Sequence, residues 1–300
     1  MTEPVSALFA YVSKFAEVKG SRMHYVQHGI GHGEPLLFLH GNPTSCYLWR
    51  NVMPFLFSMR RNIAMDLIGM GQSDKPDIPY RVFDHADYVE AFIDTLGLQR
   101  LGVVLHDWGG FAGLRFAARH PERVSSIVMM ENVVKPMQWE DRSEGFQKAF
   151  RMLRSELGEQ KIMEENFFVE RILPGSILRK LTAEELEIYR APFKEKSARK
   201  PTLAFPRDIP IGGEPQDVVQ ELEWIDATLA KAGIPMLLLT FEPGAIIQKA
   251  EIDWCRATFP TLTIKEMGPG IHFVQEDQPN RIGRAIGSWL ANLDQTRAAK

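Results

Sequence analysis

Cysteine is scarce in this 300-residue chain, which contains only Cys46 and Cys255. The two residues lie far apart and form neither a CxxC pair nor a metal-ligand spacing. The sequence therefore gives no sign of a disulfide framework or of a cysteine-based metal site. We expect such a chain in the reducing cytoplasm.

Long apolar runs are also missing. No stretch reaches the roughly 18 uninterrupted apolar residues that a membrane-spanning helix needs, so we expect no membrane partner. The stretch 1–20 carries Glu3, Lys14, Glu17 and Lys19 instead of an apolar segment. This pattern argues against a secretory signal peptide.

An excess of charge of either sign is absent as well. The chain has 35 Lys and Arg against 38 Asp and Glu, a net charge of −3. No basic field is available to attract nucleic acid or an acidic membrane surface, so a small neutral ligand fits better. Hydrophobic residues make up 45% of the chain, which is enough to bury a large core.

Short apolar runs alternate with amphipathic stretches along much of the chain. Helix-like patterns at 82–96 and 110–118 separate several of these runs, which is typical of parallel strands joined by crossover helices. The stretch 15–27 alternates like an antiparallel edge pair. We therefore expect an α/β fold with a mostly parallel central sheet flanked by helices. The runs predicted as strands are 35–39, 61–65, 101–105, 124–130, 236–240 and 262–266.

The alternation of strands and helices stops after Glu131. From there to Gly213 the chain has charged, helix-favouring segments such as 143–157 and 182–189, several prolines and no recognisable strand. We interpret residues 133–213 as a helical cap domain, inserted into a core domain formed by residues 1–132 and 214–300. A surface excursion without catalytic meaning is the alternative.

Reactive side chains follow several predicted strands, at the edge where open α/β sheets bind ligands. The segment 106–110, His-Asp-Trp-Gly-Gly, has the pattern of a nucleophile elbow, with Asp107 where esterases carry serine. A carboxylate is ionised at neutral pH, and its attack on carbon yields an ester. His272, late in the chain, is suited to activate water that hydrolyses this ester. Capping the next helix is the structural alternative for Asp107.

Two further residues, Asn42 and Trp108, stand where α/β hydrolases build their oxyanion hole from backbone N–H groups. Their side chains are neutral hydrogen-bond donors. Two such donors beside a carboxylate are able to hold a departing halide in a dry pocket. The alternatives are core packing for Trp108 and turn formation before Pro43 for Asn42.

A carboxylate must also orient His272, and two glutamates compete for this role. Glu131 follows one predicted strand, and Glu242 follows the next, in a Glu-Pro-Gly turn. We favour Glu131, because Glu242 has the context of a solvated turn residue. His106 is interpreted as a structural neighbour of the elbow, and no His, Asp and Glu cluster shows metal-ligand spacing.

These residues resemble the haloalkane dehalogenases of the α/β-hydrolase fold, and within them the subfamily with an Asn and Trp pair as halide donors and a Glu acid. The resemblance spans nearly the whole chain. Several of its motifs are shared with other α/β hydrolases, whereas the combination of Asn42, Trp108 and Glu131 is much less widely shared. The matching segments are 40–45, 66–76, 106–110, 131, 205–211, 242–244 and 270–273.

The resemblance implies a two-step reaction on a small apolar halogenated substrate. Asp107 would displace a halide ion, held by Asn42 and Trp108, and His272 with Glu131 would then hydrolyse the alkyl ester to an alcohol. No cofactor and no metal would be needed. Apolar cap residues, with Phe168 and Pro210 as candidates, would line the substrate pocket.

Three other functions fit parts of this pattern. Epoxide hydrolases share the aspartate elbow, but they use cap tyrosines, and Tyr189 is the only tyrosine between residues 132 and 213. Epoxide hydrolases also usually have glycine where this chain has Leu105. Coelenterazine luciferases resemble the dehalogenases at the same five site positions, so the sequence leaves this alternative open. Hormone receptors on this fold resemble serine hydrolases, and Asp107 argues against them.

Overall fold

The computed structural model describes residues 5–299 and is built on an eight-stranded sheet. Residues 1–4, part of the N-terminal stretch considered above, and residue 300 lie outside this description. The strand order is β1-β2-β4-β3-β5-β6-β7-β8, with antiparallel pairing among β1, β2 and β4 and parallel pairing elsewhere. The prediction of a mostly parallel sheet with an antiparallel edge is confirmed. The strands are β1 (Ser13–Val18), β2 (Ser21–His28), β3 (Gly33–Leu39), β4 (Arg60–Met65), β5 (Leu101–Asp107), β6 (Val124–Asn132), β7 (Met236–Pro243) and β8 (Leu262–Gly270).

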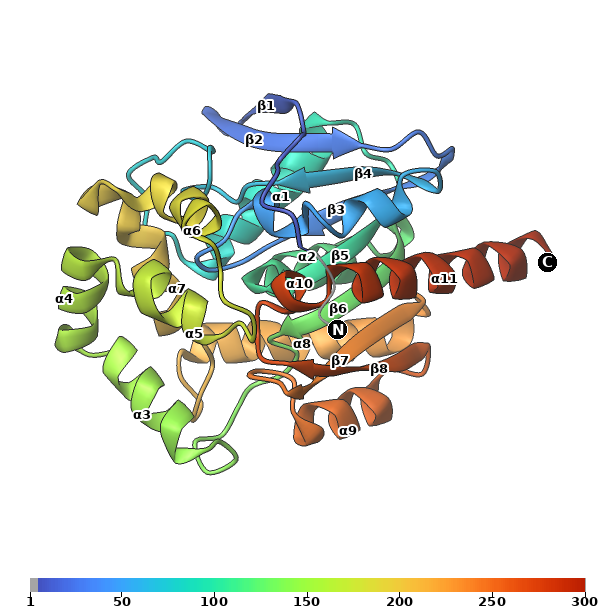
Figure 1. The fold of residues 1–300 in the computed structure, drawn as a ribbon. Coiled ribbons are helices and arrows are strands. Elements are labelled where there is room, and N and C mark those ends of the chain that lie inside the picture. Colours follow the sequence, from blue (N-terminus) through green and yellow to red (C-terminus); the bar gives the residue numbers. More distant parts are fainter. Residues whose placement is uncertain (1–4, 300) are drawn as a thin grey trace.

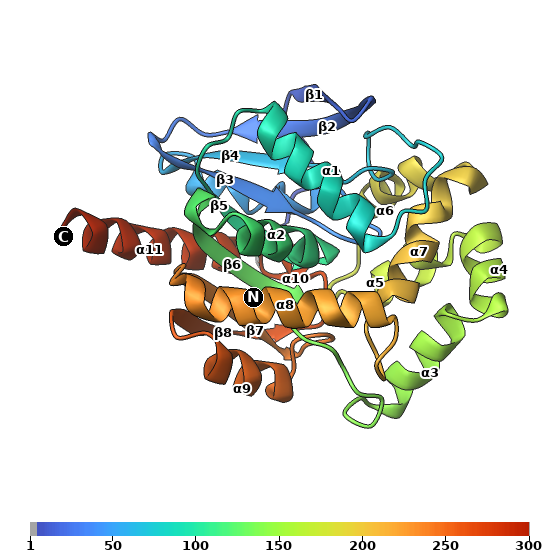
Figure 2. The same cartoon turned by 180° about the vertical axis from the view of Figure 1, so that it is seen from behind.

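Helices cover both faces of the sheet (Figures 1 and 2). Figure 2 shows α1, α2 and α8 in front of one face, and Figure 1 shows α11 in front of the other. Strands β5 and β6 are buried along their whole length, because central parallel strands have both faces covered. The helices of this core are α1 (Val82–Thr95), α2 (Trp108–Arg119), α8 (Gln216–Ala232), α9 (Lys249–Thr258), α10 (Val274–Asp277) and α11 (Pro279–Ala298).

The segment between β6 and α8 is helical, and both views place its helices together on one side of the sheet (Figures 1 and 2). The predicted helical stretch 143–157 is divided into two helices, because the hydroxyl of Ser155 accepts from the N–H of Gly158 and so caps a new helix. The helices of this segment are α3 (Glu144–Leu153), α4 (Glu156–Glu165), α5 (Leu173–Gly175), α6 (Ala183–Arg190) and α7 (Lys200–Asp208).

Two further expectations concern the chain as a whole. Within residues 5–299, no helix is long and apolar enough to span a membrane. Cys46 and Cys255 are both buried and unpaired, so they form no disulfide.

Candidate active site

Asp107 lies in the tight turn between β5 and α2. Its φ of 51° and ψ of −129° are backbone angles that non-glycine residues rarely adopt. The turn packs closely against the end of β3, where a Cβ on Gly109 would lie 2.5 Å from the carbonyl oxygen of His40. A Cβ on Gly41 would lie 1.9 Å from Oδ1 of Asp107. The two glycines thus leave the space that the strained turn and its carboxylate need.

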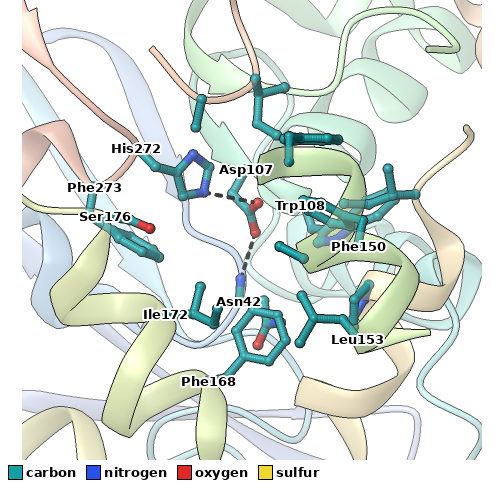
Figure 3. A pocket seen from close by; sticks show the side chains of 16 residues that line it. Asn42, Asp107, Trp108, Phe150, Leu153, Phe168, Ile172, Ser176, His272 and Phe273 are labelled. Atoms are coloured by element: carbon teal, nitrogen blue, oxygen red, sulfur yellow. Dashed lines mark hydrogen bonds and ion pairs between the residues drawn. The ribbon is translucent and has the colours of Figure 1, made fainter. Parts of the chain in front are cut away.

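Hydrogen-bond donors on two sides hold the Asp107 carboxylate (Figure 3). The backbone N–H of Asn42 donates to Oδ1 at 2.7 Å, and Nε2 of His272 lies 3.3 Å from Oδ2. Burial alone would raise the pKa of Asp107, but His272 and the backbone N–H of Trp108 lower it below its ordinary value. The carboxylate is therefore ionised at neutral pH without help from a base.

Glu131 lies behind His272, on the side away from Asp107. Its Oε2 is 3.4 Å from Nδ1 of His272 and accepts hydrogen bonds of 2.9 Å from the backbone N–H groups of Ala245 and Ile246. These two donors belong to the turn after Glu242. Glu242 itself is exposed, so the structure brings Glu131 and not Glu242 to the histidine.

His272 lies between the two carboxylates, with one ring nitrogen facing each. Burial would lower the pKa of His272, but the contacts with Asp107 and Glu131 outweigh burial and raise it to about 9. The imidazole is thus protonated at neutral pH while Asp107 is ionised. Any reaction that neutralises Asp107 removes part of the cause and lowers the pKa of His272.

His106 has a structural role beside the elbow. Its Nε2 donates a hydrogen bond of 2.9 Å to the carbonyl oxygen of His272, because a carbonyl can only accept. Burial lowers the pKa of His106 to about 3, with His272 as the next cause. A permanently neutral ring that supports the backbone of His272 fits the predicted role as a structural neighbour.

Helix α7 reaches the two predicted halide donors. Pro206 lies inside α7 and has no N–H, so the carbonyl oxygen four residues earlier, on Thr202, lacks its helical partner. This oxygen accepts from Nδ2 of Asn42 at 3.4 Å. The ring of Phe205 stacks on the indole of Trp108, with centroids 5.8 Å apart and planes at 16°. The segment between β6 and α8 therefore helps to orient the side chains of Asn42 and Trp108.

A cavity of about 190 Å³ opens at the Asp107 carboxylate, and Figure 3 shows the side chains that line it. Asn42, Trp108 and His272 reach its wall, and the remaining lining is mostly apolar. The predicted pocket residue Phe168 lines it. Pro210 does not line it: this residue is buried just beyond the end of α7, and its carbonyl oxygen accepts from the N–H of Met137 at 2.8 Å. The other lining residues are Phe146, Ala149, Phe150, Leu153, Ile172, Ser176, Pro206, Ile209, Ala245, Ile246 and Phe273.

Sequence reasoning missed the contribution of α3 to this cavity. Phe146, Phe150 and Leu153 are spaced four and three residues apart, so they share one face of the helix and line the cavity together. This spacing was a signal for an apolar face. Its direction, toward the site and not toward the core, depends on how the cap packs.

One cluster of potential metal ligands, His24, Cys46 and Asp66, was not visible from sequence spacing. Hydrogen bonds already occupy the Asp66 carboxylate, from His24 Nδ1 at 2.8 Å and from the backbone N–H groups of Cys46 and Gln72. Burial and the nearby Asp66 raise the pKa of the Cys46 thiol well above its ordinary value. The cluster is therefore a hydrogen-bonded part of the core.

Comparison with known proteins gives a consistent family. Residues 34–162 match the family model of the α/β-hydrolase fold. A haloalkane dehalogenase from Sphingobium indicum is 45% identical over 286 residues, which cover 93% of this chain and 95% of that protein. A haloalkane dehalogenase from Bradyrhizobium diazoefficiens is 42% identical, with 94% and 95% covered. The crystal structure of a haloalkane dehalogenase from Bradyrhizobium elkani matches with a TM-score of 0.92 at 43% identity, with 95% of this chain and 99% of that chain covered.

Proposed function

The chain belongs to the haloalkane dehalogenases of the α/β-hydrolase fold, hydrolases that act on carbon–halide bonds, and from this premise we propose how its own residues perform the reaction. The overall change is the conversion of a haloalkane and water to an alcohol, a halide ion and a proton. We assign the nucleophile to Asp107, the base to His272 and the acid that orients the base to Glu131.

In the first step, a carboxylate oxygen of Asp107 attacks the carbon that carries the halogen, from the side opposite the leaving group. The carbon–halogen bond breaks with both electrons on the halide, and an alkyl ester forms on Asp107. The Nδ2 of Asn42 and the indole N–H of Trp108 stabilise the departing halide, because both residues line the cavity and both side chains carry neutral donors. This proposal places the chain in the subfamily with an Asn and Trp donor pair.

In the second step, His272 activates water. Formation of the ester removes the negative charge of Asp107, which is the main contact that raises the pKa of His272, so the imidazole becomes a base. Water loses a proton to His272 and attacks the carboxyl carbon of Asp107. The backbone N–H of Asn42, already 2.7 Å from Oδ1, is oriented to stabilise the oxyanion. Collapse of this intermediate breaks its bond to the alkoxide, which takes the proton from His272 and leaves as the alcohol. The carboxyl group of Asp107 then loses the remaining proton and returns to its carboxylate form.

We also propose that residues 133–213 act as a cap domain over this site. The support is that α3 and α7 supply lining side chains, including Phe150 and Pro206. A cavity of about 190 Å³ with a mostly apolar wall suits a short apolar haloalkane.

The observation that carries the assignment is the position of Asp107. Its ionised carboxylate lies at an apolar cavity, between Nε2 of His272 and the N–H of Asn42. A serine hydrolase would place an uncharged hydroxyl there, which requires a base before it attacks. The carboxylate is suited to attack saturated carbon directly.

The position of Tyr189 weighs against epoxide hydrolysis. Its hydroxyl donates to Glu276 and its side chain is 1% exposed, and it is absent from the cavity lining. No tyrosine lines this cavity within residues 5–299, so the acid that opens an epoxide ring is missing from its wall. Coelenterazine oxidation remains a second activity to assay on the same protein.

Halide and acid release from a panel of brominated and chlorinated alkanes tests the proposal. Wild type should release halide, and Asp107→Ala should release none above background. His272→Phe should still be alkylated, so mass spectrometry should detect the ester on Asp107. Wild type that turns over no member of the panel, or His272→Phe that turns over normally, would contradict the assignment. Parallel assays with styrene oxide and coelenterazine test the two alternatives.

A further inference from the structure

The loop that carries His272 has few supports from the sheet. It follows β8, which is an edge strand with β7 as its single neighbour, and it leads into α10, a helix of four residues. Strand pairing therefore fixes this loop less firmly than it fixes the Asp107 turn, which follows a strand paired on both sides. Other contacts must hold the base.

A short piece of the cap segment, residues 176–179, supplies these contacts, and we call it the strap. The carbonyl oxygen of Ser176 accepts from the backbone N–H groups of His272 and Phe273, both at 3.2 Å. In the opposite direction, the carboxylate of Asp277 accepts from the N–H groups of Leu178 at 3.0 Å and Arg179 at 2.9 Å. The strap is thus hydrogen-bonded to both ends of the segment 272–277.

The side chain of Arg179 adds a third attachment. Its Nε donates to the backbone carbonyl oxygen of Glu276 at 2.5 Å, and Nη2 contacts the Glu276 carboxylate. The same guanidinium forms two hydrogen bonds, of 2.8 and 2.7 Å, with the carboxylate of Glu185 on α6. One planar group therefore joins the cap segment to the loop of the base.

Arg50 completes the charge balance beneath this junction. Its guanidinium binds Glu276 through two hydrogen bonds of 2.6 and 2.8 Å and Glu185 through one of 2.9 Å. Arg50, Glu185 and Glu276 are each at most 3% exposed. Two arginines and two glutamates make the cluster neutral, so removing one of the most buried members would leave an uncompensated charge. The experiment must instead use Arg179, which lies at the rim of this cluster, and Asp277, which lies outside it and binds the backbone of the strap.

We propose that Arg179 and Asp277 are positioning residues for the hydrolytic step: through the strap they keep Nε2 of His272 in place to activate water at the ester on Asp107. This inference rests on the proposed function. The strap has no hydrogen bond to Asp107 or to the halide donors among the contacts of residues 5–299. Ser176 of the strap lines the cavity, but Arg179 and Asp277 do not. Changes at these two residues should therefore slow hydrolysis of the ester and leave alkylation of Asp107 nearly unchanged.

The test compares the two steps in Asp277→Asn and Arg179→Lys. Asp277→Asn keeps the shape but removes the charge and replaces one of the two accepting oxygens near the Leu178 N–H with an NH2 group, which cannot accept. Arg179→Lys keeps the charge but loses the planar fork. Rapid-quench single turnovers with 1,2-dibromoethane, followed by mass spectrometry of the protein, give the rates of ester formation and ester decay. We expect ester decay at least about tenfold slower, as for a misplaced catalytic group, and ester formation within about twofold of wild type.

Arg190→Gln is the matched control. Arg190 ends α6 in the same cap segment, and its ion pairs with Glu170 and Glu187 stay within that segment. A general loss of cap stability would lower the thermal midpoint in all three variants without changing the ratio of the two rates. Arg179→Lys should be the milder of the two strap variants, because its retained charge partly rescues the junction.

The outcomes separate the two proposals. Slower ester decay in Asp277→Asn and Arg179→Lys, with an unchanged ratio in Arg190→Gln, supports the strap. If Asp277→Asn and Arg179→Lys fold and their ester decays at the wild-type rate, the strap proposal is wrong, while the proposed function stands. Wild type that forms no ester on Asp107 would overturn the proposed function, and the strap proposal with it.

Discussion

Nε2 of His272 lies 3.3 Å from Oδ2 of Asp107, yet different parts of the protein hold the two residues in place. Asp107 ends β5, a strand paired with β3 and β6, and its turn packs directly on the end of β3. His272 follows an edge strand, and its backbone N–H donates to Ser176 of the cap segment. The sheet holds Asp107, the proposed nucleophile, whereas the segment between β6 and α8 helps to hold His272, the proposed base.

This difference matches the demands of the two proposed steps. The turn of Asp107 stores an unfavourable backbone conformation, which persists only where the surroundings are rigid. His272 must instead exchange a proton and change its pKa within each turnover. A cap segment that varies in sequence would then alter hydrolysis and substrate fit more readily than the nucleophile itself.

The largest expected effect on the base side comes from Glu131→Gln. The glutamine keeps an oxygen for the N–H groups of Ala245 and Ile246, but it removes the charge that stabilises the protonated His272. Hydrolysis of the ester should slow by roughly 10²- to 10⁴-fold, the usual contribution of a positioned base, with little change in alkylation. Transient kinetics of ester decay measures this effect.

Glu242→Gln is the control for this change. Glu242 is exposed and was the competing candidate for the acid. Its replacement should leave both rates unchanged. If Glu242→Gln slowed ester decay while Glu131→Gln did not, the acid would have to be reassigned.

The matching change on the nucleophile side is Gly41→Ala. Its Cβ would lie 1.9 Å from Oδ1 of Asp107, so the carboxylate or the turn must move. A displacement of about 1 Å costs roughly 10²-fold in rate, and we expect this loss in the burst of ester formation. Gly145→Ala in α3 is the control, because no heavy atom lies within 4 Å of the added Cβ. Normal ester formation in Gly41→Ala would contradict the rigid support of Asp107.

Much of the part of the site that the sheet supports, around Asp107, could be predicted from the sequence. The runs at 101–105 and 124–130 are mostly apolar, apart from Ser125 and Ser126, because β5 and β6 are buried on both faces. The elbow pattern around Asp107 is local. The same reasoning indicated that Asn42, Trp108, Glu131 and His272 share one site, and the structure brings them together. Their catalytic roles stay predictions.

The part of the site that the segment between β6 and α8 supports was harder to predict from the sequence. Pro210 was expected in the pocket wall, but Pro206 and Ile209 are the residues of that stretch that line it. A shift of one to four residues along a helix end changes which side chain faces the cavity, and the sequence does not specify that rotation. The strap was also invisible, because it depends on contacts between residues about 100 positions apart, such as Leu178 with Asp277.

A smaller effect is expected on the pKa of His272, through the charge of Asp107. In Asp107→Asn the negative charge facing His272 is lost while the side-chain shape remains, so the variant imitates the neutral ester. The pKa of His272, raised to about 9 in the native protein, should fall by at least about one unit, because a nearby anion favours the protonated ring. An NMR titration of the imidazole measures the shift.

Asp226→Asn controls for a general effect of removing a buried carboxyl, since Asp226 on α8 does not contact His272. The pKa of His272 should not change in this variant. An unchanged pKa of His272 in Asp107→Asn would mean that the contact with Glu131 alone keeps the imidazole protonated. The proposal that ester formation turns His272 from an acid into a base would then be wrong.

The smallest expected effect concerns Trp108, one of the two proposed halide donors, where α7 contacts the core. Phe205 of α7 stacks on Trp108 of α2, and Phe205→Leu removes an aromatic contact of about 0.5–1.5 kcal/mol, or about two- to tenfold in bromide affinity. Bromide quenching of tryptophan fluorescence measures it. Phe193→Leu is the control, because Phe193 is an equally buried cap residue that does not stack on Trp108. Equal weakening in both variants would mean that α7 only fills space, and that the sheet alone orients the Trp108 indole.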